Sequence, residues 1–365
     1  MRGERARGRW SRTLLQFAAA MAIAHGDAAN AQNEYHQDLQ FPAPGPAFNF
    51  QEVSWLTVGP GGSVYMLQRG GLDVSIWNPA GPMLKGWWPN QLLYPHSLRV
   101  QRLPSGESRI WVTDMVPPSQ QVVPQGHCVK EFTEGGQLLG TIGACGAGTQ
   151  GSGLDPVQFD KVTDIAFDSK GLRWISDGDL GGLNNRVLQL DAGDHVLQVW
   201  SAPNNQPGSD PGQFNLPHAL DIDPCDRVFV ADALNHRVQI IKTDGSFLQQ
   251  LQCFGTDGVY GLRLAKTSSG GLQLATTSSP TSNPAGGTVR LFEVAPSCTA
   301  AQPVPGNCAT SAQWGIALPP SPMTGMLHSI DVGGDGSVYI ATLGGNLPPQ
   351  KWVPVQSSSV SRAPR

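Results

Sequence analysis

The sequence predicts an all-β protein, a six-bladed β-propeller, on three observations. The 365 residues include 44 Gly and 30 Pro, as expected of a chain with many turns. No segment has a long apolar period of 3.6 residues, so few helices are expected. A short strand motif recurs six times along the chain. Repeats long enough for four strands each favour blades around a central channel over a sandwich.

The first 31 residues contain a charged region, an apolar region and a cleavage site in the order found in secretory signal peptides. Five arginines lie in residues 1–12, an apolar run covers residues 14–24, and Ala29 and Ala31 form an A-x-A end. The apolar run is too short to span a bilayer. We therefore expect an exported protein, periplasmic or extracellular, that begins near Gln32. An uncleaved anchor is the alternative.

The remaining chain is acidic. Cleavage removes five Arg and two acidic residues, which moves the formal net charge from -4 to about -7. A nucleic-acid partner would favour a basic face, so none is expected, and no later segment is apolar enough to span a membrane. We expect a loose segment over residues 32–48, the propeller over 49–355 and a disordered Ser-rich tail over 356–365. The oligomeric state stays open.

Each repeat begins with an alternating apolar strand. The six copies are SWLTV at 54–58, HSLRV at 96–100, TDIAF at 163–167, HALDI at 218–222, YGLRL at 260–264 and HSIDV at 328–332. A turn and a second strand follow, as in RVFVAD at 227–232, and then a third strand, as in NHRVQIIK at 235–242, so each unit is an antiparallel meander. The third and fourth copies match at a constant offset of 55 residues, which indicates duplication.

Six cysteines in an exported chain favour disulfides over a metal cluster. Their order favours three local pairs: Cys128–Cys145, Cys225–Cys253 and Cys298–Cys308. Six cysteines allow 15 pairings, so the connectivity stays open. No pair has C-x-x-C spacing, which argues against a zinc ribbon or a thioredoxin-type redox site.

Three histidines occupy the leading position of alternate repeats. The six leading residues are Ser54, His96, Thr163, His218, Tyr260 and His328. Taken singly, each histidine is more often a turn residue or a partly buried polar group. Alternate blades of a six-bladed ring are related by a pseudo-threefold axis, so the three imidazoles should converge on one point. Three neutral nitrogens suit Zn²⁺ and leave the fourth tetrahedral position to water or substrate.

The motifs resemble those of NHL-repeat β-propellers, through PGQFN at 211–215, V-A-D at 230–232 and N-H-R-V-Q at 235–239. With the three histidines, W-V-T-D at 111–114 and I-S-D-G at 175–178, the chain resembles the peptidyl-α-hydroxyglycine α-amidating lyases. These enzymes release glyoxylate from a hydroxylated C-terminal glycine and leave a peptide amide.

The resemblance implies roles for individual residues. It implies that His96, His218 and His328 bind zinc, that Met326 belongs to the active site, and that Arg69 binds the substrate carboxylate with a guanidinium suited to that task. Taken without the resemblance, Arg69 is an ordinary surface arginine at a strand end.

Three positions depart from that family. Asp179 stands where the family has a catalytic Tyr, Ala233 where it has a second substrate-binding Arg, and Ser329 where an Asp contributes to a calcium site. The change at Ser329 argues against Ca²⁺. Two residues are candidate substitutes: Asp179 as a base of lower pKa, and Tyr260 as a phenol near the metal. The alternative interpretations are that Asp179 is a turn residue and that the Tyr260 side chain fills the channel.

The leading hypothesis is an exported zinc lyase of the amidating type with an altered active site, acting on a small-molecule or peptide substrate. A His₃ zinc site could also serve a metal-dependent hydrolase of esters or lactones. A third hypothesis is a non-catalytic NHL propeller that binds proteins or peptides, because fold alone does not decide function.

Overall fold

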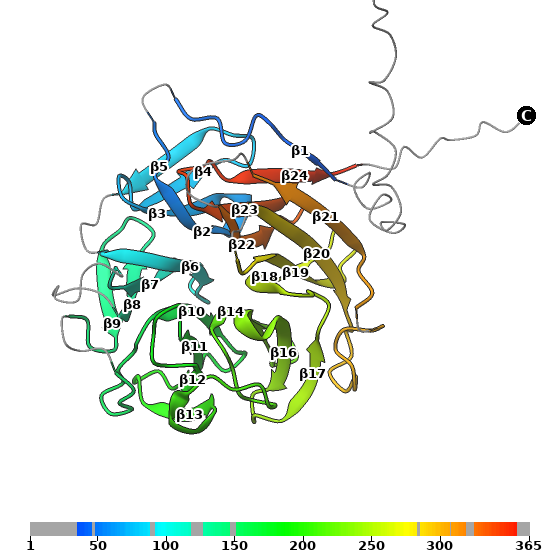
Figure 1. Ribbon diagram of the computed structural model, residues 1–365. Helices are drawn as coiled ribbons and strands as arrows, with labels where there is room; N and C mark the ends of the chain where they lie inside the picture. Colours follow the sequence, from blue (N-terminus) through cyan, green and yellow to red (C-terminus); the bar gives the residue numbers. More distant parts are fainter. Residues whose placement is uncertain are drawn as a thin grey trace, which may run out of the picture.

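The computed structural model describes residues 35–45, 48–87, 92–117, 127–146, 151–282, 285–306, 308–318 and 325–355. The predicted signal peptide and the predicted C-terminal tail lie outside these residues. Within them the chain forms an all-β propeller (Figure 1), so the predicted fold class is confirmed. None of the helices in these ranges is long and apolar enough to cross a membrane.

Four sheets each consist of four strands that follow one another in chain order. The first sheet contains β2 (Glu52–Val58), β3 (Val64–Arg69), β4 (Val74–Trp77) and β5 (Met83–Trp87). The second contains β6 (Tyr94–Arg102), β7 (Ser108–Met115), β8 (Cys128–Thr133) and β9 (Leu138–Ile142). The third contains β10 (Val162–Phe167), β11 (Arg173–Asp177), β12 (Arg186–Leu190) and β13 (Val196–Ser201). The fourth contains β14 (Pro217–Ile222), β15 (Arg227–Asp232), β16 (Arg237–Lys242) and β17 (Phe247–Leu251).

The remaining strands form one eight-stranded sheet. One half contains β18 (Asp257–Lys266), β19 (Leu272–Pro280), β20 (Gly286–Val294) and β21 (Ala312–Ala317). The other contains β22 (Met326–Val332), β23 (Val338–Leu343), β24 (Gln350–Pro354) and β1 (Tyr35–Gln37). A parallel bridge between Gly286 and Met326 joins the halves. The predicted count of six blades is therefore not confirmed, because hydrogen bonding gives four sheets of four strands and one of eight.

The N-terminal strand corrects one predicted boundary. Residues 32–48 were expected to be loose, but β1 pairs with β24 in antiparallel register, with Tyr35 opposite Pro354 and Gln37 opposite Trp352. Three residues are too few to show a period of two, so the sequence pattern could not reveal this strand. The two ends of the propeller are thereby hydrogen-bonded to each other.

Two of the three predicted disulfides are wrong. Cys128 pairs with Cys145 as expected, but Cys225 pairs with Cys298 and Cys253 with Cys308. The segment between β20 and β21 lies against the neighbouring sheet, where Arg227 Nη2 donates to the Ala295 carbonyl at 2.7 Å. This excursion brings cysteines together that are 73 and 55 residues apart in sequence.

Neighbouring sheets pack through apolar side chains. Between the third and fourth sheets, Trp174 and Val187 form one buried cluster with Val228 and Val230. Burial of such side chains stabilises the fold by about 1.5–3 kcal/mol each. The innermost strands β2, β6, β10, β14, β18 and β22 contact one another in turn, and β22 contacts β2. This closed ring of strands surrounds the centre of the molecule (Figure 1).

Candidate metal centre

A β-bulge occurs at the leading residue of every innermost strand. The pairing between the first and second strands shifts by one residue at Ser54, Thr163, His218, Tyr260 and His328. In β6 the shift covers both His96 and Ser97. A bulge changes the direction of a side chain relative to the sheet. The repeated bulge thus gives the leading residues a shared orientation.

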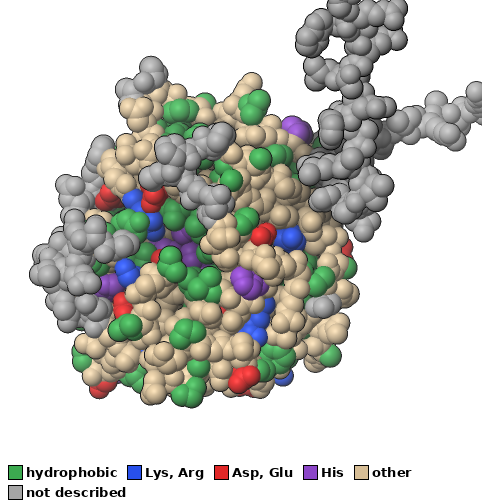
Figure 2. Space-filling view, viewed as in Figure 1, with side chains coloured by type: hydrophobic (Ala, Val, Ile, Leu, Met, Phe, Trp, Pro, Cys, Tyr) green, Lys and Arg blue, Asp and Glu red, His purple; other side chains and the backbone are tan. Residues whose placement is uncertain are grey.

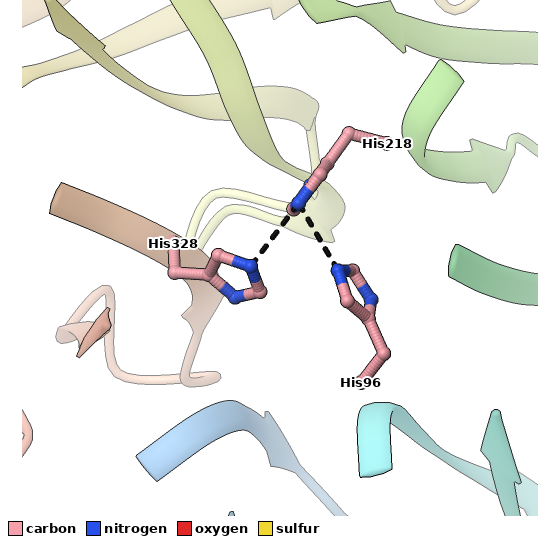
Figure 3. Close-up of side chains that lie close together, drawn as sticks. All are labelled: His96, His218 and His328. Carbon is pink, nitrogen blue, oxygen red and sulfur yellow. Dashed lines mark hydrogen bonds between the residues drawn. The ribbon is translucent and has the colours of Figure 1, made fainter. Parts of the chain in front are cut away.

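The three predicted histidines come together from β6, β14 and β22. All three side chains are buried. The Nε2 atom of His218 lies 3.2 Å from Nε2 of His96 and 3.1 Å from Nε2 of His328 (Figure 3). Among the described residues they form a group of side chains that could hold one metal ion.

The opposite nitrogen of each ring is bound to the backbone. Nδ1 lies 2.8 Å from the Thr163 carbonyl in His96, 2.7 Å from the Tyr260 carbonyl in His218, and 2.6 Å from the Ser54 carbonyl in His328. Each of these carbonyls belongs to the leading residue of the next innermost strand. A carbonyl can only accept, so Nδ1 must carry the proton and Nε2 of a neutral ring must not.

Three unprotonated Nε2 atoms therefore face one another. Burial is the main cause that lowers the pKa of all three histidines, and the shift is large for His96 and His328. Neutral rings in this arrangement could hold a cation. Two ligand atoms that are each about 2.0–2.1 Å from a tetrahedral zinc ion lie about 3.3–3.4 Å apart. The two measured Nε2 separations are close to this distance, so the donor set fits zinc.

The structure places Asp179 beside the histidines. Its Oδ2 atom lies 3.8 Å from His96 Nε2, and 22% of its side chain is exposed. The backbone amides of Gly178 and Asp179 both donate to the Lys161 carbonyl, at 3.0 and 3.1 Å. Lys161 has a left-handed φ of 71°, which turns the chain immediately before β10. A carboxylate is thus held between the solvent and the candidate metal site.

The structure also places Arg69 near the site. Its positive charge contributes to the lowered pKa of all three histidines. Three groups hold the guanidinium: the Glu52 carboxylate at 2.8 Å from Nη1, the Pro95 carbonyl at 3.1 Å from Nε, and the Tyr94 ring with its centroid 3.8 Å from Cζ. The Arg69 side chain is 7% exposed, so the guanidinium is a largely buried cation held beside the histidines.

Tyr260 lies beside His218, and Met326 packs with Tyr260. The Tyr260 ring packs edge-on against His218, with centroids 5.2 Å apart. Burial, followed by the charges of Asp179 and Asp257, raises the pKa of Tyr260, so its hydroxyl stays protonated. Met326 packs beside Tyr260 in a small apolar cluster that includes Ala233. At Ala233, where the amidating-lyase family has an arginine, this chain therefore has an apolar surface.

Trp55 was not identified from the sequence. Its ring centroid lies 5.8, 6.3 and 5.9 Å from those of His96, His218 and His328, so it packs against all three imidazoles. It directly follows the leading residue of the first repeat, where the other repeats have a smaller residue. That difference in size, at an aligned position, was the available signal.

A second unpredicted feature is a ring of charges further along the innermost strands. Arg99 Nε donates to Asp164 at 3.0 Å, and Arg263 Nε donates to Asp331 at 3.2 Å. Asp221 lies 3.7 Å from both guanidinium groups. Burial raises the pKa of Asp221 and of Asp331 to about 6. These side chains fill the interior on one side of the histidines.

The other side opens toward solvent, where Arg69 and Asp179 lie. Figure 2 shows histidine side chains in the central part of this face, with basic and acidic side chains close to them and hydrophobic side chains around. Fold and site together define a class: a β-propeller with three convergent histidines on its axis.

The comparisons with known proteins agree with the propeller fold. The chain is 35% identical over 207 residues to NHL repeat-containing protein 3 of Mus musculus, a match that covers 55% of each protein. It is 30% identical over 157 residues to peptidylglycine alpha-amidating monooxygenase of Rattus norvegicus, covering 42% of this chain and 14% of that protein. The chain thus matches about half the length of the first relative and a small part of the second. NHL repeat-containing proteins and this monooxygenase are its homologues, as the motifs indicated.

No protein-family model matches the chain. Among solved structures, a streptogramin B lyase has a TM-score of 0.50 at 14% identity and covers 89% of this chain, with 99% of its own length matched. The virginiamycin B lyase of Staphylococcus aureus has a TM-score of 0.51 at 12% identity, covering 88% of this chain and 100% of that one. At these identities the likeness shows the propeller fold alone.

Proposed function

We propose that the protein is an exported, zinc-dependent carbon–nitrogen lyase of the amidating-lyase type. The observation that carries the proposal is the meeting of three unprotonated Nε2 atoms, each ring held by a backbone carbonyl at Nδ1. Such an arrangement needs a shared positive charge. Homology to the amidating monooxygenase over 157 residues supports the choice of reaction.

We also propose that the propeller has six blades. The two halves of the eight-stranded sheet each have four strands, and the bridge between Gly286 and Met326 is their parallel link. Counting each half as a blade puts the three histidines in alternate blades. The three disulfides support export, because such bonds persist in oxidising compartments.

Two residues around the histidines, Arg69 and Asp179, have proposed roles in the reaction. Zinc would act as a Lewis acid that lowers the pKa of the substrate hydroxyl. The Arg69 guanidinium binds the substrate carboxylate. The Asp179 carboxylate accepts the hydroxyl proton as the carbon–oxygen double bond of glyoxylate forms and the carbon–nitrogen bond breaks. The same proton then passes to the departing amide nitrogen, so the products are glyoxylate and a neutral amide.

The test combines metal analysis with an assay of glyoxylate release from an N-acyl-α-hydroxyglycine. We expect one zinc ion per chain and turnover that is lost in His218→Ala. His195→Ala is the matched control, because His195 is exposed in the turn between β12 and β13 and pairs with Asp191. A chain that binds no metal contradicts the proposal. Zinc without glyoxylate release, together with ester or lactone hydrolysis, would replace the lyase with the hydrolase.

A further inference from the structure

We propose that His127 is a positioning residue for Asp179: from the neighbouring sheet it holds the turn that keeps the Asp179 carboxylate beside His96. The inference rests on the proposed function in giving that carboxylate a task in the reaction. It adds a residue of another sheet that fixes where the carboxylate lies.

Lys161 is the link between His127 and Asp179. Its backbone carbonyl accepts from the amides of Gly178 and Asp179, at 3.0 and 3.1 Å. Its backbone amide donates to Nδ1 of His127 at 3.2 Å. His127 directly precedes β8 of the second sheet, and Lys161 directly precedes β10 of the third, which is the next sheet in the ring (Figure 1). One residue therefore connects the second sheet to the loop that carries Asp179.

The conformation of Lys161 depends on these contacts. Its φ of 71° is left-handed, which is unfavourable for a residue other than glycine. The Lys161 side chain also reaches the second sheet, where Nζ donates to the Val116 carbonyl at 3.1 Å. His127 and Val116 thus hold the backbone and the side chain of the same residue. Without the His127 acceptor, the Lys161 amide loses the bond that fixes the turn.

His127 is buried and held in the accepting form. Its side chain is 4% exposed, and the next residue, Cys128, is bonded to Cys145. An amide N–H can only donate, so Nδ1 of His127 carries no proton and Nε2 of the neutral ring does. Burial is the main cause that lowers the pKa of His127; the charge of Asp160 opposes this shift and that of Lys161 adds to it.

The next repeat contains a copy of this arrangement with an amide in place of the imidazole. Asn185 directly precedes β12, as His127 precedes β8, and its Oδ1 atom accepts from the Leu216 amide at 2.9 Å. Leu216 has a left-handed φ of 65°, and its carbonyl accepts from Ala233 N at 3.0 Å. The two copies share an acceptor atom at this position, so an asparagine in place of His127 should keep the link.

The copies differ in the residue that follows the turn. Leu234 follows Ala233 in the fourth sheet, whereas Asp179 follows Gly178 in the third and places Oδ2 3.8 Å from His96 Nε2. The acceptor at His127 therefore determines the position of a charge beside the candidate metal site. A displacement of a reacting group by about 1 Å can lower an enzymatic rate by about 10²-fold.

The first test measures amide hydrogen exchange of the zinc-loaded protein by NMR, without substrate. His127→Phe keeps a ring but removes the acceptor, so the amides of Gly178 and Asp179 should exchange at least about fivefold faster. His127→Asn should stay within about twofold of the unmodified protein, because it restores an acceptor. His127→Ala serves as the second variant if His127→Phe does not fold.

His236→Phe is the matched control for exchange. His236 directly precedes β16, as His127 precedes β8, but its Nδ1 atom lies 3.0 Å from the Asp257 carbonyl. Its loss should leave exchange at Gly178 and Asp179 unchanged. A general loosening of the propeller would instead accelerate exchange at these amides in His236→Phe as well, and this result overturns the inference.

The second test separates positioning of Asp179 from support of the histidines. With an N-acyl-α-hydroxyglycine, His127→Phe should lower kcat by at least about tenfold, while KM and zinc content change by less than about twofold. His127→Asn should restore kcat. Loss of zinc together with kcat overturns the inference, because His127 would then act through Thr163, whose carbonyl holds His96.

The exchange measurement does not depend on turnover. Faster exchange in His127→Phe, restored in His127→Asn, supports the link even if the unmodified protein releases no glyoxylate, a result that would disprove the proposed reaction alone. Unchanged exchange in both His127→Phe and His127→Ala overturns the inference whether or not the protein is a lyase. Faster exchange with unchanged kcat in an active lyase also overturns it.

Discussion

The Nε2 atoms of His218 and His328 lie 3.1 Å apart, although the Nδ1 proton of each ring is already committed to a carbonyl. Two lone pairs at this distance repel each other unless a cation lies between them. The carbonyl acceptors belong to Tyr260 and Ser54, on the neighbouring innermost strands. A bound ion would therefore link strands around the whole ring, and its removal should lower the stability of the fold.

Removal of the metal is expected to lower the thermal stability of the protein. An ion present at 100 times its Kd stabilises a folded protein by about 2.7 kcal/mol, which corresponds to a change in Tm of roughly 5 °C for a domain of this size. Calorimetry before and after chelation measures the change. His218→Ala should show almost no difference between the two conditions. A Tm of the unmodified protein that chelation leaves unchanged would contradict a shared ion.

Replacement of Asp179 tests its role as a base. Asp179→Asn keeps the size of the side chain but cannot accept a proton, so kcat should fall by about 10² to 10⁴. The zinc content should stay the same, because the three imidazoles are untouched. Asp194→Asn, in the same sheet, is the control, since Asp194 pairs with Arg173 away from the histidines. Unchanged turnover in Asp179→Asn would rule out this base.

The charged ring predicts a specific pH dependence of stability. The pKa of Asp221 is raised to about 6, against about 4 in an unfolded chain. Between these values the folded protein holds a proton that the unfolded chain has released. The carboxyl therefore contributes stability that is complete below about pH 4 and is lost as the pH rises through 6.

Asp221→Asn removes this dependence. The free energy of unfolding of the variant minus that of the unmodified protein should increase between pH 4.5 and pH 7.5, by up to roughly 3 kcal/mol. Thermal unfolding at both pH values measures the difference. Asp226→Asn, at a half-buried position outside the ring of charges, is the control for this trend. A constant offset between Asp221→Asn and the unmodified protein would show that the carboxyl does not titrate in this range.

The disulfides differ in the length of chain that they close. Cys225 and Cys298 are 73 residues apart, whereas Cys128 and Cys145 are 17 apart. Chain entropy predicts a stabilisation of about 4 kcal/mol for the first and about 3 kcal/mol for the second. Replacing both cysteines of a pair by Ser should lower Tm more for the Cys225–Cys298 pair. Denaturation of the two double variants under oxidising conditions tests this order, and the opposite order would contradict it.

The repeats explain why the histidines could be located from the sequence. Six aligned strands define a leading position, and the bulge at each of these positions keeps the side chains equivalent in space. The alignment carries this information because each copy has the same local structure. Asp179 was identified instead from the resemblance to the amidating lyases, although its distance from His96 depends on a left-handed turn at Lys161.

Other features depend on contacts between repeats, which an alignment of repeats does not contain. The pairing of Cys225 with Cys298 requires the segment after β20 to lie on the fourth sheet. Trp55 contacts all three histidines only when the ring of strands is closed. The strand β1 is recognisable only through its partner β24. In each case the deciding interaction joins residues that are far apart in the chain.

The pairing of β1 with β24 has a consequence for biosynthesis. Among the described residues β1 is synthesised first and β24 last. The edge of β24 stays unpaired until it forms hydrogen bonds with β1. His328 belongs to the same sheet as β24, and the third imidazole therefore arrives only after the other five innermost strands have been made. A nascent or truncated chain that ends before β22 can neither close the ring nor hold an ion through three nitrogens.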